Sequence, residues 1–195
     1  TWKAKSLIEI DDDLENARKL CDKSISIDNN PFAYNTKGLS YILEYDYPKA
    51  IECFEQAIEI DPTYDNAYTN KIYCLYHQKN YSKCIEFAKK SWDLFKDNRD
   101  MPWYIGDCYS SLQESDKAIE YYKKALEIDP KATSLILSIG WEYYYLQKYD
   151  KATEYLNKAK EVSPGDESVN YFESQLKKQK LPEAERIVGY PLHTV

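Results

Sequence analysis

Apolar and small residues recur at intervals of three and four along most of this chain, with polar residues between them. The stretch 99–132 shows the pattern clearly, with Tyr109 in its first half and Ala118 and Ala125 in its second. Such spacing gathers the apolar side chains on one face of a helix, and a short polar link separates the two halves. The stretch therefore predicts two amphipathic helices. The second is expected to end before Pro130, because proline has no backbone N–H to donate.

The same pattern returns at a period of about 34 residues, so the helix pair is expected to be repeated along the chain. A small residue occupies the register of Ala118 in each copy, and another occupies the register of Ala125. The equivalent pairs are Ala50 and Ala57, Cys84 and Ser91, and Ala152 and Ala159. On these residues the sequence resembles the tetratricopeptide-repeat (TPR) family, and the resemblance covers roughly residues 1 to 180.

The resemblance implies an all-α fold, a right-handed superhelical solenoid of antiparallel helix pairs that a C-terminal capping helix closes. The array is expected to span residues 1–180 and to be followed by an extended C-terminal tail at 181–195. Within the array we expect a partial repeat at 1–30, full repeats at 31–64, 65–98, 99–132 and 133–166, and the capping helix at 167–180.

The first 30 residues are expected to form a degenerate opening repeat. Its first helix is predicted to be short, around residues 2–9. The aspartates at 11–13 are expected to form a turn that caps the next helix, since negative charge suits a helix N-terminus. Ala17 and Cys21 then reproduce the spacing of the later second helices.

Glycines and tyrosines at equivalent positions predict how the helices pack. A glycine inside a helix costs up to about 1 kcal/mol relative to alanine, so three of them in first helices indicate close approach to a neighbouring helix. The glycines are Gly38, Gly106 and Gly140, and the small partners expected to face them are Ala50, Ala118 and Ala152. The tyrosines expected in the core are Tyr41, Tyr109, Tyr122 and Tyr143.

The overall charge narrows the class of partner. A net charge of −7 and a pI near 5.0 argue against binding to nucleic acid, which usually requires a basic stripe, and against an anionic membrane surface. The sequence contains no apolar run of the roughly 18 residues that a membrane-spanning helix needs. We therefore expect no nucleic-acid binding and no membrane insertion.

The reactive side chains indicate structure rather than catalysis. The five cysteines are odd in number and follow the repeats, which predicts buried free thiols in a reducing compartment, the cytoplasm. Cys74 and His77 lie three residues apart on one predicted helix, but two ligands do not make a zinc site, and we interpret them as a buried thiol beside a surface histidine. No catalytic residues, metal site or cofactor are predicted.

The resemblance implies that the first helices line a concave groove that binds a peptide or helix of a partner protein. The register carries the groove positions onto Asn35, Leu39, Asn70, Tyr73, His77, Trp103, Asp107, Trp141, Tyr144 and Tyr145, with Tyr171 on the capping helix. The lysines and arginines with which some members of the family hold the acidic C-termini of chaperones are missing from the matching positions. This aromatic, mostly uncharged set predicts a ligand with apolar or aromatic side chains and a polar backbone.

The sequence therefore predicts a non-catalytic protein–protein interaction scaffold. The alternative from another class is a regulatory or substrate-recruiting segment of a larger enzyme. Two further hypotheses concern the chain itself. The apolar stretch 187–192 has the extended character to dock in the groove, and the abbreviated first repeat leaves an end of the stack open to self-association.

Overall fold

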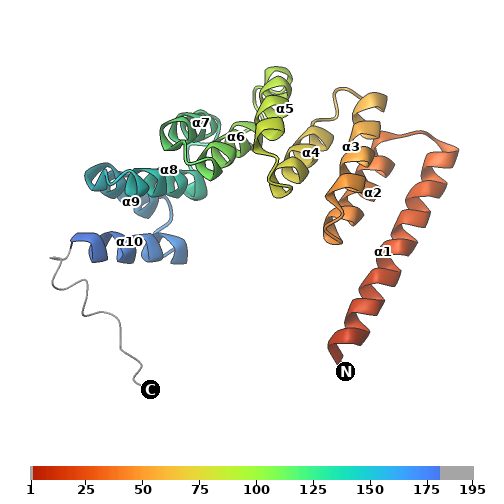
Figure 1. Ribbon diagram of the computed structural model, residues 1–195, viewed down its shortest axis with the longest axis horizontal. Coiled ribbons are helices and arrows are strands. Elements are labelled where there is room, and N and C mark those ends of the chain that lie inside the picture. The colour runs from red at the N-terminus through yellow and green to blue at the C-terminus, as the bar shows by residue number, and fades with distance from the viewer. Residues whose placement is uncertain (1, 181–195) are drawn as a thin grey trace. The chain divides into compact units, whose positions relative to one another are not determined.

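The computed structural model describes residues 2–180, which form ten helices and contain no strand (Figure 1). The prediction of an all-α fold is confirmed. The chain divides into two compact units, residues 1–108 and 109–195. The helices are α1 (Trp2–Ile27), α2 (Pro31–Leu43), α3 (Tyr47–Ile60), α4 (Asp65–His77), α5 (Tyr81–Leu94), α6 (Asp100–Ser111), α7 (Ser115–Ile128), α8 (Thr133–Tyr145), α9 (Tyr149–Val162) and α10 (Glu167–Lys180). The predicted tail, including its docking stretch, lies outside the described residues.

The helix boundaries repeat with the period seen in the sequence. The second helices α3, α5, α7 and α9 are each 14 residues long and begin at positions 47, 81, 115 and 149, always 34 residues after the one before. The first helices α2, α4 and α8 are each 13 residues long, and α6 begins one residue late, at Asp100. Helix α10 covers the stretch where the capping helix is predicted.

Local sequence explains where these helices begin and end, as α3 illustrates. The Asp46 carboxylate accepts a hydrogen bond from the Lys49 backbone N–H at 3.2 Å, which satisfies one of the amide groups left free at a helix N-terminus. Pro48 occupies the first turn, where its missing N–H does no harm. At the other end Asp61 follows the last helical residue, and Pro62 prevents the helix from continuing.

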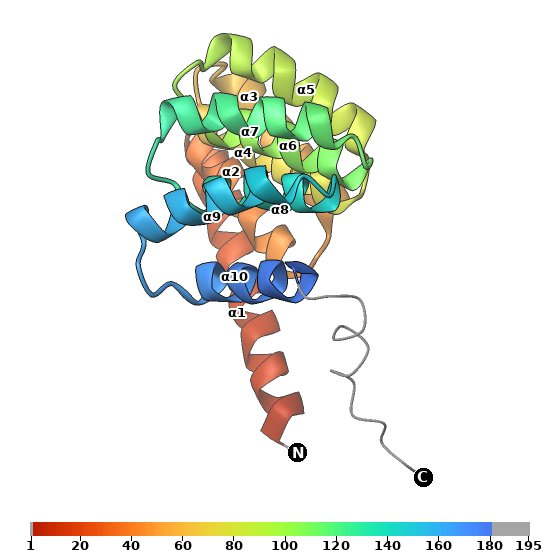
Figure 2. The ribbon, with the colours of Figure 1, turned by 90° about the vertical axis from the view of Figure 1, so that its left-hand side faces the viewer.

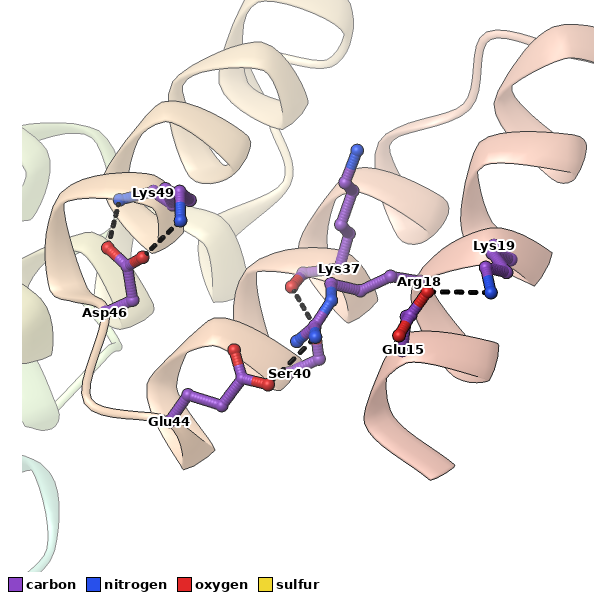
Figure 3. Close-up of polar contacts among 8 residues, drawn as sticks. All are labelled: Glu15, Arg18, Lys19, Lys37, Ser40, Glu44, Asp46 and Lys49. Atoms are coloured by element: carbon purple, nitrogen blue, oxygen red, sulfur yellow. Dashed lines mark hydrogen bonds and ion pairs between the residues drawn. The ribbon is translucent and has the colours of Figure 1, made fainter. Parts of the chain in front are cut away.

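The opening of the chain differs from the prediction, because residues 2–27 form one continuous helix. The aspartates at 11–13 lie inside α1, so the expectation of a short first helix and a capping turn is wrong. Two ion pairs tie this helix to the first full repeat: Arg18 to Glu44 at 2.8 Å and Lys37 to Asp22 at 2.6 Å. Figure 3 shows the Arg18 side chain reaching from α1 to Glu44 at the end of α2.

The register that defines the repeats is the register of the core. The side chains at the two small positions of every second helix are buried, and seven of these eight have no exposed surface. In the first unit Ala50, Phe54 and Ala57 of α3 pack with Ala67 and Cys74 of α4. The core is therefore a seam between successive helices, which is the arrangement expected of a repeat stack.

The predicted partners of Gly38 and Gly140 need correction. A Cβ atom built on Gly38 would lie 2.5 Å from Cε1 of Phe54, and one on Gly140 would lie 2.7 Å from Cε1 of Phe172. The nearest neighbours of these glycines are therefore aromatic rings, not the alanines Ala50 and Ala152. Each glycine makes room for a ring that fills the space between helices.

The tyrosines predicted in the core divide into two pairs. Tyr122 and Tyr143 are buried, as predicted, but Tyr41 and Tyr109 are only half-buried. Cations lie over the faces of these two rings, Arg18 at 5.0 Å from the centroid of Tyr41 and Lys117 at 5.2 Å from that of Tyr109. These half-buried rings therefore belong to the boundary of the core, where each can meet a cation.

The links between paired helices contain a repeated backbone feature that the sequence does not reveal. One non-glycine residue in each link adopts a positive φ, at intervals of 34 residues. These residues are Tyr45 (φ 60°), Lys79 (φ 59°), Gln113 (φ 61°) and Gln147 (φ 57°). The left-handed conformation normally favours glycine at the end of a helix, since a Cβ atom destabilises it.

Replacing Gln113 with glycine is expected to raise the free energy of unfolding by about 0.5–1 kcal/mol. The relief of left-handed strain, about 1–2 kcal/mol, outweighs the extra backbone freedom of glycine in the unfolded chain, about 0.4–1 kcal/mol. Urea denaturation followed by circular dichroism measures the change. Gln113→Ala serves as the control because it keeps the Cβ atom, and a glycine variant no more stable than the alanine variant would contradict the strain argument.

In the described part of the chain, no helix is both long enough and apolar enough to cross a membrane.

Candidate functional site

The second unit contains a pocket of about 710 Å³ between α8 and α10. Helix α10 packs beside α8 and α9, as both views of the ribbon show (Figures 1 and 2). Three lining residues, Trp141, Tyr144 and Tyr145, come from α8 and were predicted as groove residues. The others come from α10 and are Glu167, Ser168, Tyr171 and Gln175.

Each of the two helices gathers its pocket residues on one face. On α8 the three aromatic residues are spaced by three and four, so they share one face. On α10 the pocket residues Glu167, Tyr171 and Gln175 recur every fourth position. The opposite face of α10 carries Val169, Phe172 and Leu176, all buried, and this apolar face holds the helix against the unit.

The aromatic rings of the pocket are fixed against one another. The Trp141 centroid lies 5.4 Å from that of Tyr144 in an edge contact, 6.0 Å from Tyr145 and 5.9 Å from Tyr171. Beneath them Phe172 packs on Trp141 at 4.5 Å, and Gln179 donates a hydrogen bond of 2.9 Å to the Tyr144 hydroxyl. Tyr145 and Tyr171 are 65% and 60% exposed, so the rings form a supported surface that remains open to solvent.

The electrostatic environment of this pocket is negative. Glu167 is the charged residue among those that line it in the described part of the chain. Glu142, also on α8, is buried, and its carboxylate accepts a hydrogen bond of 2.5 Å from the Ser110 hydroxyl. Burial raises the pKa of Tyr145, and the nearby Glu142 carboxylate raises it further. The Tyr145 phenol is therefore neutral at neutral pH.

In the first unit, a cluster of aromatic rings contains three predicted residues, Tyr73, His77 and Trp103. The rings of Tyr73 and His77 lie 4.1 Å apart, and Trp103 stacks on Tyr104 at 5.3 Å. Tyr104 connects the two groups, because its centroid lies 6.4 Å from that of Tyr73. Tyr47 of α3 also stacks on His77, with ring centroids 5.8 Å apart.

The other predicted groove residues of the first unit differ in how deeply they are buried and in what they contact. The Asn70 side-chain amide donates a hydrogen bond of 2.8 Å to the amide oxygen of Asn35, and Asn35 itself is buried. Leu39 is exposed on α2. Asp107 is half-buried near Tyr104, whose pKa is raised first by burial and further by the Asp100 and Asp107 carboxylates.

Sequence reasoning missed Tyr47 and Tyr104 in the first unit and Glu167, Ser168 and Gln175 in the second. Tyr47 begins a second helix, and the predicted groove positions lie on first helices and on the capping helix. The sequence pattern does indicate that the α10 residues share a face, since positions 167, 171 and 175 repeat at the spacing of one helix face. They lie close to Trp141 because of the way α10 packs, and no local sequence pattern predicts that packing.

The structure offers no cluster suited to hold a metal ion, as far as the described residues show. Cys74 is fully buried and His77 is exposed, which confirms the interpretation of a buried thiol beside a surface histidine. All five cysteines are free and buried, as predicted. Burial raises the pKa of Cys53 to about 11 and that of Cys74 to about 12, so both remain unreactive thiols at neutral pH.

Comparisons with known proteins agree with this architecture. Family profiles described as "Tetratricopeptide repeat" match residues 31–64, 104–132 and 134–166. No curated protein sequence matches the chain. Among solved structures, MamA is 26% identical with a TM-score of 0.69, and the match covers 78% of this chain and 90% of MamA.

Two further structures are similar in fold. YrrB, described as a TPR protein with an unusual peptide-binding site, is 20% identical with a TM-score of 0.67 over 87% of this chain and 88% of its own. PilF of Pseudomonas aeruginosa is 17% identical with a TM-score of 0.70 over 90% of this chain and 88% of its own. At these identities the likeness concerns the fold alone.

Proposed function

Because this chain belongs to the tetratricopeptide-repeat family, we propose that it is a non-catalytic scaffold that binds a peptide or helix of a partner protein. The observation that carries the proposal is the pocket between α8 and α10, lined by Trp141, Tyr144, Tyr145 and Tyr171. TPR stacks are typical protein-interaction folds, and successive helices give them long surfaces suited to extended or helical ligands.

The aromatic rings supply the binding energy in this proposal. Large exposed rings that are already held in place by neighbours lose little conformational freedom when a ligand covers them. A ring that becomes desolvated in an interface is worth about 2 kcal/mol or more, so two or three of them support roughly micromolar affinity. Phe172 and Gln179 hold the rings of the second unit in the arrangement that the ligand meets.

The first unit is proposed to contribute through its aromatic cluster. Tyr73, His77 and Trp103 provide apolar contact, and the half-buried amide of Asn70 lies one helical turn from Tyr73, where it suits a peptide backbone. Asn35 orients that amide through their hydrogen bond. We assign Leu39 and Asp107 to the same surface by register.

The proposal is tested by selecting peptides from a random display library against the full chain and measuring their affinity by calorimetry. We expect Trp141→Ala/Tyr145→Ala or Trp103→Ala to weaken the selected peptides by about tenfold to thirtyfold per anchor lost. Leu94→Ala is the control, because Leu94 is exposed on α5 outside both aromatic clusters. A failure to select any peptide, or affinities that all these variants leave unchanged, would refute the proposed function.

A further inference from the structure

We propose that the pocket between α8 and α10 binds a positively charged side chain of the partner peptide, an arginine or a lysine; this rests on the proposed function and specifies its ligand. The pocket combines aromatic faces from two helices with a carboxylate, Glu167, in its lining. Such a combination recognises a cation through the negative faces of the rings and through charge attraction at once.

The arrangement of the rings suits a positively charged group. Tyr145 lies nearly parallel to Trp141, at an interplanar angle of 27°. Tyr144 meets Trp141 at 77° and Tyr145 at 78°. The rings therefore line the pocket in two orientations. A compact cation or a planar guanidinium in the pocket is attracted by more than one ring face.

Charge in the surroundings favours the same ligand. The lining supplies Glu167, and α8 also carries the buried carboxylate of Glu142, to which Ser110 donates a hydrogen bond. No lysine or arginine belongs to the lining in the part of the chain that the structure describes. Two lysines near the pocket residues in sequence are paired elsewhere: Lys148 with Asp116 at 3.6 Å and Lys177 with Glu173 at 2.8 Å.

The N-terminus of α10 is the part of the pocket that would attract an anion, but a side chain of this protein already accepts hydrogen bonds from its amides. Helix α10 begins at the pocket, and free amides at a helix N-terminus attract negative charge. The Asp166 carboxylate accepts hydrogen bonds from the backbone N–H groups of Ser168 and Val169, at 2.8 and 3.2 Å. With Asp166 and Glu167 at this end of the helix, an anionic ligand would meet two carboxylates instead of open donors.

The test compares N-acetyl-arginine amide with N-acetyl-citrulline amide, a neutral ligand of nearly the same shape. Each is titrated at millimolar concentrations into the full chain, and the indole resonance of Trp141 is followed by NMR after assignment with Trp141→Phe. We expect the arginine compound to bind about fivefold to thirtyfold more tightly than the citrulline compound.

Glu167→Gln removes the charge and keeps the shape, so it should bring the arginine affinity towards that of citrulline. Glu161→Gln on α9, outside the pocket, is the matched control and should change neither affinity. Thermal unfolding of both variants verifies that α10 stays docked. Equal binding of the two ligands, tighter binding of citrulline, or no shift of Trp141 with either would overturn the cation proposal. Peptides selected on the same pocket without a basic residue would leave the scaffold function intact while refuting this inference.

Discussion

Replacing Gly38 with leucine is expected to lower the free energy of unfolding by about 1–3 kcal/mol, the usual cost of overpacking a core. A Cβ atom at this position already lies 2.5 Å from the buried ring of Phe54, so a larger side chain must displace that ring. Better helix propensity offsets only about 1 kcal/mol of the loss. Urea denaturation of the full chain, followed by circular dichroism, measures the effect.

A double-mutant cycle identifies the clash as the cause. Phe54→Ala alone should cost about 3–5 kcal/mol because it opens a cavity in the core. In Gly38→Leu/Phe54→Ala the leucine fills part of that cavity, so the two losses should fall short of additivity by about 1 kcal/mol or more. Thr36→Leu, on the exposed side of the same helix, is the control. Additive losses in the cycle would show that Gly38 does not serve the Phe54 ring.

Glycines that look alike in the sequence serve different physical purposes. Gly38 and Gly140 have ordinary helical backbone and are needed because an aromatic ring lies against them. Gly165 has no heavy atom within 4 Å of its would-be Cβ, but its φ of +87° disfavours any side chain. The repeat register predicted that Gly38 and Gly140 lie at close contacts. It could not identify the contacting residue, because that depends on which helix presents a large side chain at the same level.

The same limit explains the error at the start of the chain. The acidic positions 11–13 resemble a helix-capping turn, yet residues 2–27 contain neither glycine nor proline to interrupt a helix. Without a breaker, polar residues on a helix are only a solvated surface. Where proline does mark an end, as at Pro130, the prediction is confirmed, because α7 ends at Ile128.

The pocket shows how far a register can predict a site. The repeat pattern placed Trp141, Tyr144 and Tyr145 on one face of a first helix, and these residues do line a common pocket. The other wall belongs to α10, which is not paired with a second helix of its own in the described residues. Its contribution of Glu167 and Gln175 follows from packing at the end of the stack, and a 34-residue period carries no information about that.

Phe172→Ala is expected to release α10 from the second unit. Phe172 is fully buried, packs on Trp141 at 4.5 Å and fills the space above Gly140. Truncating a buried phenylalanine costs about 3–5 kcal/mol. Because α10 is the last described helix and is held mainly by one apolar face, the loss should appear as local undocking before the rest of the unit unfolds. Amide hydrogen exchange in residues 167–179 should become roughly a hundredfold faster or more.

The matched control is Tyr171→Ala, one position away on the same helix. Tyr171 is 60% exposed and lines the pocket, so its removal should leave exchange in α10 within about threefold of the original protein, as a surface change does. Both variants are expected to lose peptide affinity, the first because half of the pocket lining departs with α10 and the second because one ring is missing. Similar exchange rates in the two variants would mean that Phe172 does not anchor α10. Other contacts would then hold this helix at the pocket.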